Sequence, residues 1–219
     1  MATILCLETA TTNCSVAISV DGEIKAIREE NNQKFSHAEK LHVFIDEVLK
    51  EAKIDKTQLS AVAVSKGPGS YTGLRIGVSA AKGLCFALDI PLISTLTLEV
   101  VAQQVEEETL YIIPMIDARR MEVYSAVFNS EKKQIRDTKA EILNENSFID
   151  NLKEGKTIFI GDGAIKFKAL CNHENAVFYN DKFPSSANMV SLAEAKYKIS
   201  DTENVAYFEP YYLKEFMMG

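Results

Sequence analysis

A glycine-rich segment, Gly67-Pro68-Gly69-Ser70-Tyr71-Thr72-Gly73, lies between an apolar run and a helical pattern. Backbone N–H groups at such a strand-to-helix junction can bind phosphate. The spacing does not match the P-loop, which needs a glycine followed by Lys and then Ser or Thr. It also departs from the dinucleotide loop G-x-G-x-x-G, because Thr72 stands at the third glycine position. The spacing alone therefore favours a tight turn for close helix packing over a phosphate site.

A second candidate for phosphate binding is the turn Thr9-Ala10-Thr11-Thr12-Asn13, which follows Glu8 at the end of an apolar run. Backbone N–H groups and hydroxyls of such a turn can surround an anion. Many polar hairpin turns look similar, so the signal is weak by itself. The residues singled out for a nucleotide or phosphate loop are Glu8, Thr9, Thr11, Thr12, Gly67, Gly69 and Ser70.

Metal binding and nucleophilic catalysis have less support. His37 and His42 are five residues apart, which places them about 140° apart around a helix at about 100° per residue, whereas paired ligands favour a spacing of four. His173 is far away, and no histidine has the context that activates a serine or cysteine. Asp117 and Asp162 end apolar runs, where carboxylates of α/β enzymes act, but they are equally good turn residues. We therefore predict no catalytic residue and no metal site.

The elements that would position these residues follow an α/β pattern in the first half. Apolar or alternating runs predict strands over 3–8, 14–20, 23–29, 59–65 and 92–95. Asp21-Gly22 is a typical two-residue hairpin turn. Ser36 and Glu39 have the spacing of a capping box, and apolar residues at helical spacing then predict a helix over about 37–52. Two further helices are predicted at about 73–88 and 97–105.

The second of these helices has an unusual composition. Gly73, Gly77 and Gly83 stand inside it, and each glycine in a helix interior costs about 1 kcal/mol relative to alanine. Close approach of another backbone is the usual compensation. Both this helix and the one over 37–52 have apolar residues on more than one side. Such helices bury both sides, in the core or in a partner, and the pattern leaves both outcomes open.

The second half repeats the theme more loosely. Strands are predicted over 110–116, 122–129, 135–143 and 157–161, and a helix over 186–199. The run Glu106-Glu107-Glu108 is a change in composition, and we place a domain boundary there. The expected fold is α/β with two tandem subdomains, 1–105 and 106–219, with the last helix packing back on the first subdomain.

Composition limits the classes of function. With 219 residues, of which 47% are hydrophobic, the chain can form a substantial core. A formal net charge of -7, with the acidic excess mainly in 1–110, argues against a chain that grips nucleic acid directly. The four cysteines lie in apolar runs without zinc spacing, as in reduced cytoplasmic proteins. There is no signal peptide and no apolar run of about 18 residues, so we expect no membrane span.

Taken together, the motifs resemble a known family. The segment Leu7–Ala17 looks like the first phosphate loop of the actin/Hsp70-like (ASKHA) ATPase superfold, which is built on the ribonuclease H-like motif. More specific are Lys66–Gly77, Ile116–Tyr124, Gly161–Ala164 and Pro210–Leu213, which are similar to the TsaB (YeaZ) family of bacterial proteins. Members of that family take part in threonylcarbamoyladenosine (t6A) modification of tRNA position 37. The resemblance covers 1–104 closely and the second half in patches.

The resemblance implies a chain that is not an enzyme by itself. The catalytic relatives, TsaD and other glycoprotease (peptidase M22) proteins, carry a metal-binding H-L-E-x-H stretch, where this chain has Thr97 and Val101 in place of the histidines. Neither side chain can replace an imidazole on a transition metal. An inactive homologue of TsaD is therefore implied, which neither cleaves peptides nor transfers threonylcarbamoyl alone.

The resemblance also implies partners. The family binds a TsaD-type catalytic subunit as a pseudo-symmetric heterodimer, joined by a TsaE-type ATPase, and often forms homodimers when alone. The expected function is a non-catalytic activating or scaffolding subunit of the t6A complex that contacts tRNA only through its partners. The Glu8 loop would be vestigial, and ATP or ADP would bind only at an interface with partners. The predicted interface residues are Leu41, Phe44, Ile45, Val48, Gly73, Ile76, Gly77, Ala80 and Leu84.

Two alternatives remain at this stage. One is an ATP-binding phosphotransferase or ATPase of the same superfold, although Glu8 stands where an aspartate is usual and no second phosphate loop is recognisable. The other is a metal-dependent glycoprotease-like peptidase, which the missing histidines disfavour.

Overall fold

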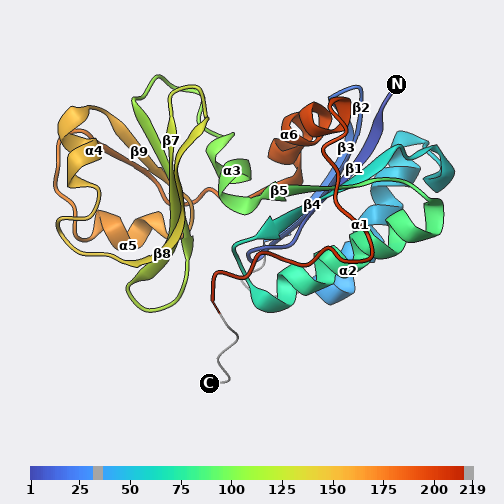
Figure 1. Ribbon diagram of the computed structural model, residues 1–219, viewed down its shortest axis with the longest axis horizontal. Helices are drawn as coiled ribbons and strands as arrows, with labels where there is room; N and C mark the ends of the chain where they lie inside the picture. The colour runs from blue at the N-terminus through green and yellow to red at the C-terminus, as the bar shows by residue number, and fades with distance from the viewer. Residues whose placement is uncertain (32–36, 215–219) are drawn as a thin grey trace. The chain divides into compact units, whose positions relative to one another are not determined.

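A computed structural model describes residues 1–31 and 37–214 of the chain (Figure 1). The chain forms two compact units, each described here by itself. The first unit contains Met1–Thr97 and Pro184–Gly219, and the second contains Leu98–Phe183. The division predicted from sequence, between 105 and 106, differs from this one. The chain enters the second unit eight residues earlier and then returns to the first.

A five-stranded sheet forms the centre of the first unit, in the order β3-β2-β1-β4-β5. Its strands are β1 (Thr3–Glu8), β2 (Asn13–Val20), β3 (Glu23–Asn31), β4 (Ala61–Gly67) and β5 (Leu92–Leu96). β1, β2 and β3 are antiparallel neighbours, whereas β4 and β5 run parallel to β1. Asp21 and Gly22 both have positive φ, as the predicted two-residue turn requires.

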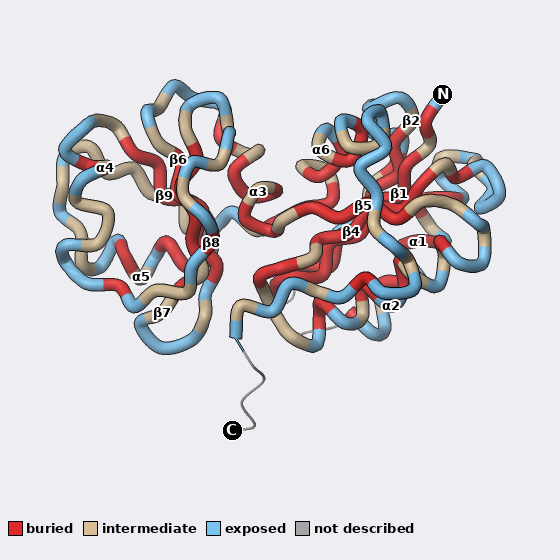
Figure 2. Tube along the Cα trace, in the orientation of Figure 1, coloured by how far each residue is buried: buried red, intermediate tan, exposed pale blue. Residues whose placement is uncertain are grey.

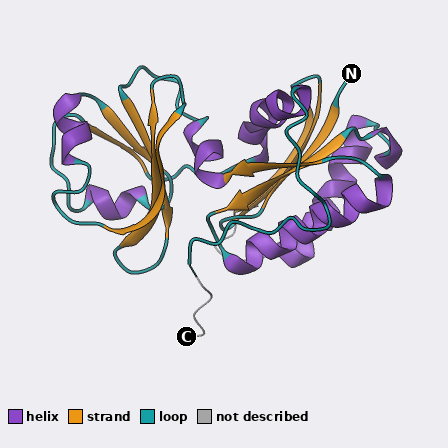
Figure 3. Ribbon diagram, in the orientation of Figure 1, coloured by secondary structure: helices purple, strands orange, loops and turns teal. Residues whose placement is uncertain are grey.

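Helices cover both faces of this sheet (Figure 3). On one face lie α1 (His37–Ala52), which contacts β2 and β3, and α2 (Tyr71–Leu88), which contacts β4. On the other face α6 (Ser186–Lys198) contacts β1, β2 and β5. Packing each helix on the sheet removes the apolar stripe of the helix and the apolar face of the sheet from water. This burial is the main favourable contribution to the free energy of forming such layers. The predicted cap residue of α1, Ser36, lies outside the described residues.

The last helix is fastened by buried hydroxyls rather than by apolar contact alone. Ser186 Oγ lies 2.6 Å from Ser15 Oγ on β2, and Ser185 Oγ donates to Glu29 on β3. Asn13 Nδ2 donates to the Pro184 carbonyl at 3.0 Å. Each of these buried side chains thus has a partner, and together they fix α6 on the sheet.

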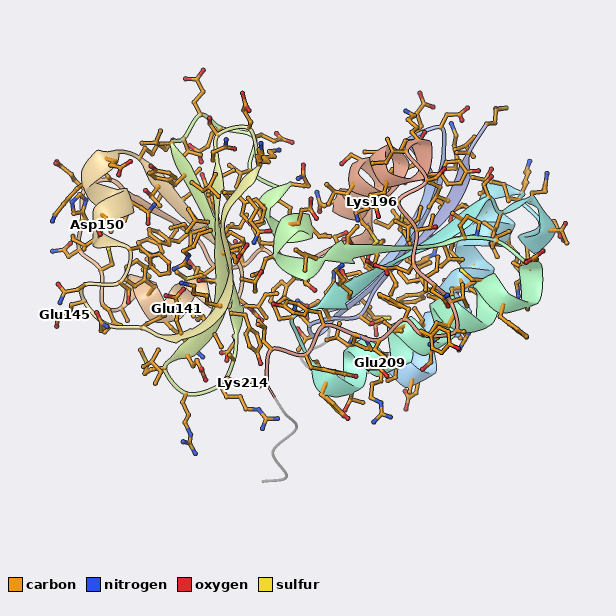
Figure 4. All side chains as sticks on the ribbon, in the orientation of Figure 1. Glu141, Glu145, Asp150, Lys196, Glu209 and Lys214 are labelled. Carbon is orange, nitrogen blue, oxygen red and sulfur yellow. The ribbon has the colours of Figure 1, made fainter. Side chains whose placement is uncertain are left out.

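Beyond α6, residues 201–214 run back along α2 as an extended segment, here called the strap (Figures 1 and 4; Glu209 and Lys214 are labelled in Figure 4). Glu203 N–H donates to the Leu92 carbonyl at 2.8 Å, and Phe208 is buried in the core of the first unit. Tyr211 N–H donates to the Lys66 carbonyl at 2.7 Å.

The second unit repeats the topology of the first. Its sheet order is β10-β9-β6-β7-β8, so β6 takes the central place of β1. The strands are β6 (Tyr111–Asp117), β7 (Glu122–Asn129), β8 (Gln134–Ile142), β9 (Thr157–Ile160) and β10 (Ala176–Tyr179). β6 is antiparallel to β7 and parallel to β9, as β1 is to β2 and β4.

The helices of the second unit are much shorter. They are α3 (Thr97–Ala102), at the junction with the first unit, α4 (Ile149–Glu154) and α5 (Ala164–Lys168). An aromatic cluster of Phe148, Phe159, Phe167 and Phe178 packs together with α4 and α5 residues in one core of the second unit. Figure 2 shows that burial in each unit is concentrated along the strands. The α/β class and the duplicated sheet confirm the predicted fold class. α4, α5 and β10 were not predicted.

Candidate functional site

The two segments that could have held a phosphate meet in the structure. Ser70 N–H donates to the Ala10 carbonyl at 2.7 Å, and Thr9 Oγ1 donates to the Gly73 carbonyl at 2.8 Å. A Cβ added to Gly69 would lie 2.3 Å from the Ala10 oxygen, so glycine is needed for this approach. The β1–β2 turn and the start of α2 are therefore in direct contact.

Glu8 supplies its own carboxylate to this loop. Its Oε1 accepts from Ala10 N–H at 2.7 Å, and its Oε2 accepts from the Ser65 hydroxyl on β4. The side chain is completely buried, and this desolvation raises the pKa of Glu8 to about 7, although the hydrogen bonds act in the opposite direction. The loop N–H group that could have bound a phosphate oxygen is thus satisfied from within the chain.

Close contacts with Thr9 explain why α2 has glycine at positions 73 and 77. A Cβ at Gly73 would lie 2.1 Å from the Thr9 carbonyl oxygen, and one at Gly77 would lie 2.3 Å from Thr9 Oγ1. The prediction that another backbone approaches this helix closely is confirmed at Gly73, where the backbone is the chain's own, whereas at Gly77 the close neighbour is the Thr9 side chain. Gly83 differs, because nothing lies within 4 Å of its added Cβ.

Two residues of this loop region were missed by sequence reasoning. Ser65 holds the Glu8 carboxylate, and His37 Nε2 lies 2.7 Å from the Thr11 carbonyl oxygen. Burial lowers the pKa of His37. A serine at the end of a buried strand and a histidine next to an apolar helix face were the available signals. His42 is exposed, so the two histidines of α1 point into different surroundings, as their spacing predicted.

In the second unit, Asp117 and Asp162 serve the equivalent turns. Asp117 N–H donates to Asp162 Oδ1 at 3.0 Å, and Asp117 Oδ1 pairs with Lys166 at 2.7 Å. Burial raises the pKa of Asp162. A Cβ at Gly163 would lie 3.1 Å from Asp117 N. Both carboxylates therefore connect β6 to the loop after β9, which is a turn-forming role.

Most of the predicted interface residues lie in the core of the first unit. Leu41, Val48, Ile45, Phe44 and Ala80 are all 9% exposed or less and belong to its apolar cluster. Gly73 and Gly77 are buried against Thr9. Buried side chains of this kind offer little surface for contact with another chain. Ile76 and Leu84 are partly exposed.

Three of the predicted residues, Ile76, Ala80 and Leu84, help to line a groove between α1 and α2 of about 760 Å³. It is lined by Ala38, His42, Tyr71, Thr72, Arg75, Ile76, Ser79, Ala80, Gly83 and Leu84. The middle of this groove is made of small side chains, and Gly83 stands open to it. Two large apolar side chains of the same helices are also exposed, Val43 at 48% and Phe86 at 85%. We call the exposed surface of α1 and α2, which includes this groove, Val43 and Phe86, the α1/α2 face.

Neither a metal cluster nor a membrane helix is found in the described ranges 1–31 and 37–214. No three His, Cys, Asp or Glu side chains there are grouped to hold an ion. No helix in the same ranges is long and apolar enough to cross a membrane. Thr97 and Val101, on α3, are completely buried.

The duplicated sheet, with a turn after each first strand that meets a glycine-containing loop, defines the class: an actin-like α/β fold, built twice on the ribonuclease H-like motif. A family model described as TsaD, tRNA N6-adenosine threonylcarbamoyltransferase, matches residues 29–214. The chain is 30% identical to the tRNA threonylcarbamoyladenosine biosynthesis protein TsaB of Haemophilus influenzae, over 97% of this chain and 93% of that protein. The chain belongs to the TsaB (YeaZ) family, which is related to TsaD.

Two further relatives show how the likeness is distributed. The solved structure of YeaZ from Pseudomonas aeruginosa is 25% identical and superposes with a TM-score of 0.81, covering 97% of this chain and 100% of that one. The tRNA N6-adenosine threonylcarbamoyltransferase of Anoxybacillus flavithermus is 35% identical over 105 residues, which are 41% of this chain and 31% of the transferase. The chain is thus a protein of t6A biosynthesis.

Proposed function

We propose that this chain is a non-catalytic, activating subunit of the bacterial complex that installs threonylcarbamoyl on N6 of adenosine 37 in tRNA. It acts by binding a TsaD-type transferase through the α1/α2 face, and with it a TsaE-type ATPase. The observation that carries the proposal is the α1/α2 face itself. It has a groove lined in part by Gly83, and Phe86 and Val43 are exposed on the same two helices. The family model matches residues 29–214, which include both helices.

The choice of partner rests on shared ancestry. The family model of the transferase matches this chain across α1 and α2, so a transferase of that family has a counterpart of the same helix pair. Two related helix pairs can meet about a pseudo-twofold axis, as identical ones do about a true twofold axis. Small side chains at such a contact let two helix backbones approach closely. A homodimer of this chain through the same face is the competing assembly when no transferase is present.

A catalytic role for the chain's own first loop has little support. Glu8 satisfies the Ala10 N–H, and the Ala10 and Gly73 carbonyls accept from Ser70 and Thr9. The Ala10 N–H, the Ser70 N–H and the Thr9 hydroxyl, which could turn toward a phosphate, are thus engaged inside the chain. This favours a binding partner over the ATPase alternative. No observation on the described residues favours the metal-dependent peptidase.

A matched pair of variants tests the proposal. Gly83→Leu fills the groove with a good helix former and meets open space within this chain, so the subunit folds. We expect at least tenfold weaker binding to the TsaD-type transferase from the same genome, measured by calorimetry, and a proportional loss of t6A formation in a reconstitution with TsaE and the carbamoyl-adenylate synthase. Ser191→Leu, at an exposed position of α6 on the other face of the sheet, is the control. Full t6A formation without this subunit would refute the activating role.

A further inference from the structure

The strap is tied to α2 at several points. The Lys82 ammonium donates to the Phe208 carbonyl at 2.8 Å and to the Ala206 carbonyl at 3.2 Å. Near the start of α2, the Tyr211 N–H bonds the Lys66 carbonyl, and a Cβ at Gly67 would lie only 2.7 Å from the Tyr211 oxygen. Glycine at position 67 therefore lets the strap reach the start of α2. The strap ends beside residues that line the groove.

At that point three side chains stack. The rings of Tyr212 and Tyr71 have centroids 4.9 Å apart, and the Arg75 guanidinium lies 5.3 Å from the centre of the Tyr71 ring. Arg75 Nη1 also donates to Tyr71 Oη at 3.2 Å. Tyr71 and Arg75 line the groove, whereas Tyr212 does not. Tyr212 therefore packs on a residue that lines the groove without lining it itself.

The charge of the groove is unusual for this chain. Among the ten residues that line it, Arg75 alone carries a formal charge at neutral pH. Arg75 is exposed, and in the described ranges no carboxylate lies within ion-pair distance of it. Arg28 and Arg136, by comparison, pair with glutamates. In a chain with a net charge of -7, an arginine at the end of an apolar groove fits a carboxylate on whatever fills that groove.

We propose that the transferase partner presents a carboxylate to Arg75, and that Tyr212 of the strap is the positioning residue that holds Tyr71 and Arg75 ready for it. This inference rests on the proposed function, because it takes the α1/α2 face as the docking surface. Arginine matches a carboxylate through two parallel hydrogen bonds, so its orientation matters. Holding the side chain in place before docking lowers the entropic cost of ordering it in the complex.

The charge part of the proposal is tested with Arg75→Gln. We expect binding to the TsaD-type transferase to weaken about tenfold at low ionic strength, and by less than about threefold in 0.5 M salt, since salt screens partly exposed ion pairs. Lys53→Gln, which removes an exposed charge outside the groove, is the control. An unchanged dissociation constant, or a loss that is the same at both ionic strengths, would overturn the assignment of a carboxylate.

The role of the strap is tested with Tyr212→Ala and Tyr212→Phe. We expect Tyr212→Ala to weaken binding about fivefold without lowering the unfolding temperature by more than a few degrees, and Tyr212→Phe, which keeps the ring, to bind like wild type. Since Tyr212 acts through Arg75, Tyr212→Ala should cost less than about twofold in the Arg75→Gln background. Additive losses would contradict the positioning role.

These outcomes are separable from those of the proposed function. If Gly83→Leu abolishes binding while the Arg75 and Tyr212 variants bind normally, the α1/α2 face stands and the inference about the strap fails. If Gly83→Leu binds normally, the proposed docking surface itself fails, and the inference with it.

Discussion

The buried carboxyl of Glu8 makes a quantitative prediction about stability and pH. An unperturbed glutamate titrates near 4.5, whereas burial raises the pKa of Glu8 in the folded chain to about 7. Below pH 4.5 both folded and unfolded chains hold the proton. Between 4.5 and about 7 the unfolded chain releases it and the folded chain keeps it, so the free energy of unfolding falls as pH rises. Since one pH unit of difference is worth 1.36 kcal/mol, the loss attributable to Glu8 between pH 5 and pH 8 is about 2.5 kcal/mol.

Glu8→Gln removes this dependence because an amide does not titrate. The amide oxygen still accepts from Ala10 N–H, and any constant cost from the changed contact with Ser65 is the same at both pH values. We therefore expect Glu8→Gln to gain about 2.5 kcal/mol relative to wild type when the pH is raised from 5 to 8. Urea unfolding monitored through hydrogen exchange of the β1 and β2 amides reports the free energy of unfolding of the first unit alone.

The control is Glu23→Gln, at an exposed position where Lys25 lowers the pKa of the carboxyl. The difference in unfolding free energy between Glu23→Gln and wild type should not rise between pH 5 and pH 8. A Glu8→Gln variant that differs from wild type by the same free energy at both pH values would refute the reasoning. It would mean that the Glu8 carboxyl is already ionised in the folded chain at pH 5.

Two other predictions concern the helices of the α1/α2 face. Gly77→Ala should destabilise the first unit by about 2 kcal/mol or more, because its Cβ would lie 2.3 Å from Thr9 Oγ1. Gly83→Ala should stabilise it by up to about 1 kcal/mol, because the space is open and alanine favours helix. Calorimetric unfolding compares the two, and equal effects would contradict the assigned contacts. Phe44→Asp should cost at least about 3 kcal/mol of stability, since the ring is buried. Val43→Asp, beside it but 48% exposed, should leave the unfolding temperature within a few degrees.

Long elements were predictable because their patterns are repeated several times. Leu41, Ile45, Val48 and Ala52 recur at helical spacing, and α1 spans the predicted residues from end to end. The hairpin at Asp21-Gly22 was equally clear, since that turn needs residues that tolerate positive φ. α4, α5 and β10 span between four and six residues each, which is too short for a period to show. They form because the second sheet offers them a place to pack.

The candidate site was predictable in its loops and not in its surface. Glu8, Thr9 and Gly69 could be named as candidates because a strand-end turn and a strand-to-helix loop are typical phosphate sites, but the contact between the two loops was not predicted. The helix faces were different. Periodicity shows that Phe44 and Leu41 lie on an apolar stripe, but it cannot tell what covers the stripe, and the chain's own sheet does. The groove uses small or polar residues such as Ser79 and Gly83, which carry no apolar signal.

The return of the chain to its first unit bears on how the protein emerges from a ribosome. Residues 98–183 form one continuous unit, which has all its own strands once Phe183 has been made. At that moment the first unit still lacks Met189 and Ala193, both completely buried in the finished protein, and Phe208 of its core. One face of its sheet stays uncovered until α6 has been made. The unit encoded first is therefore completed after the second one, and a premature stop within α6 or the strap damages the unit proposed to meet the partner.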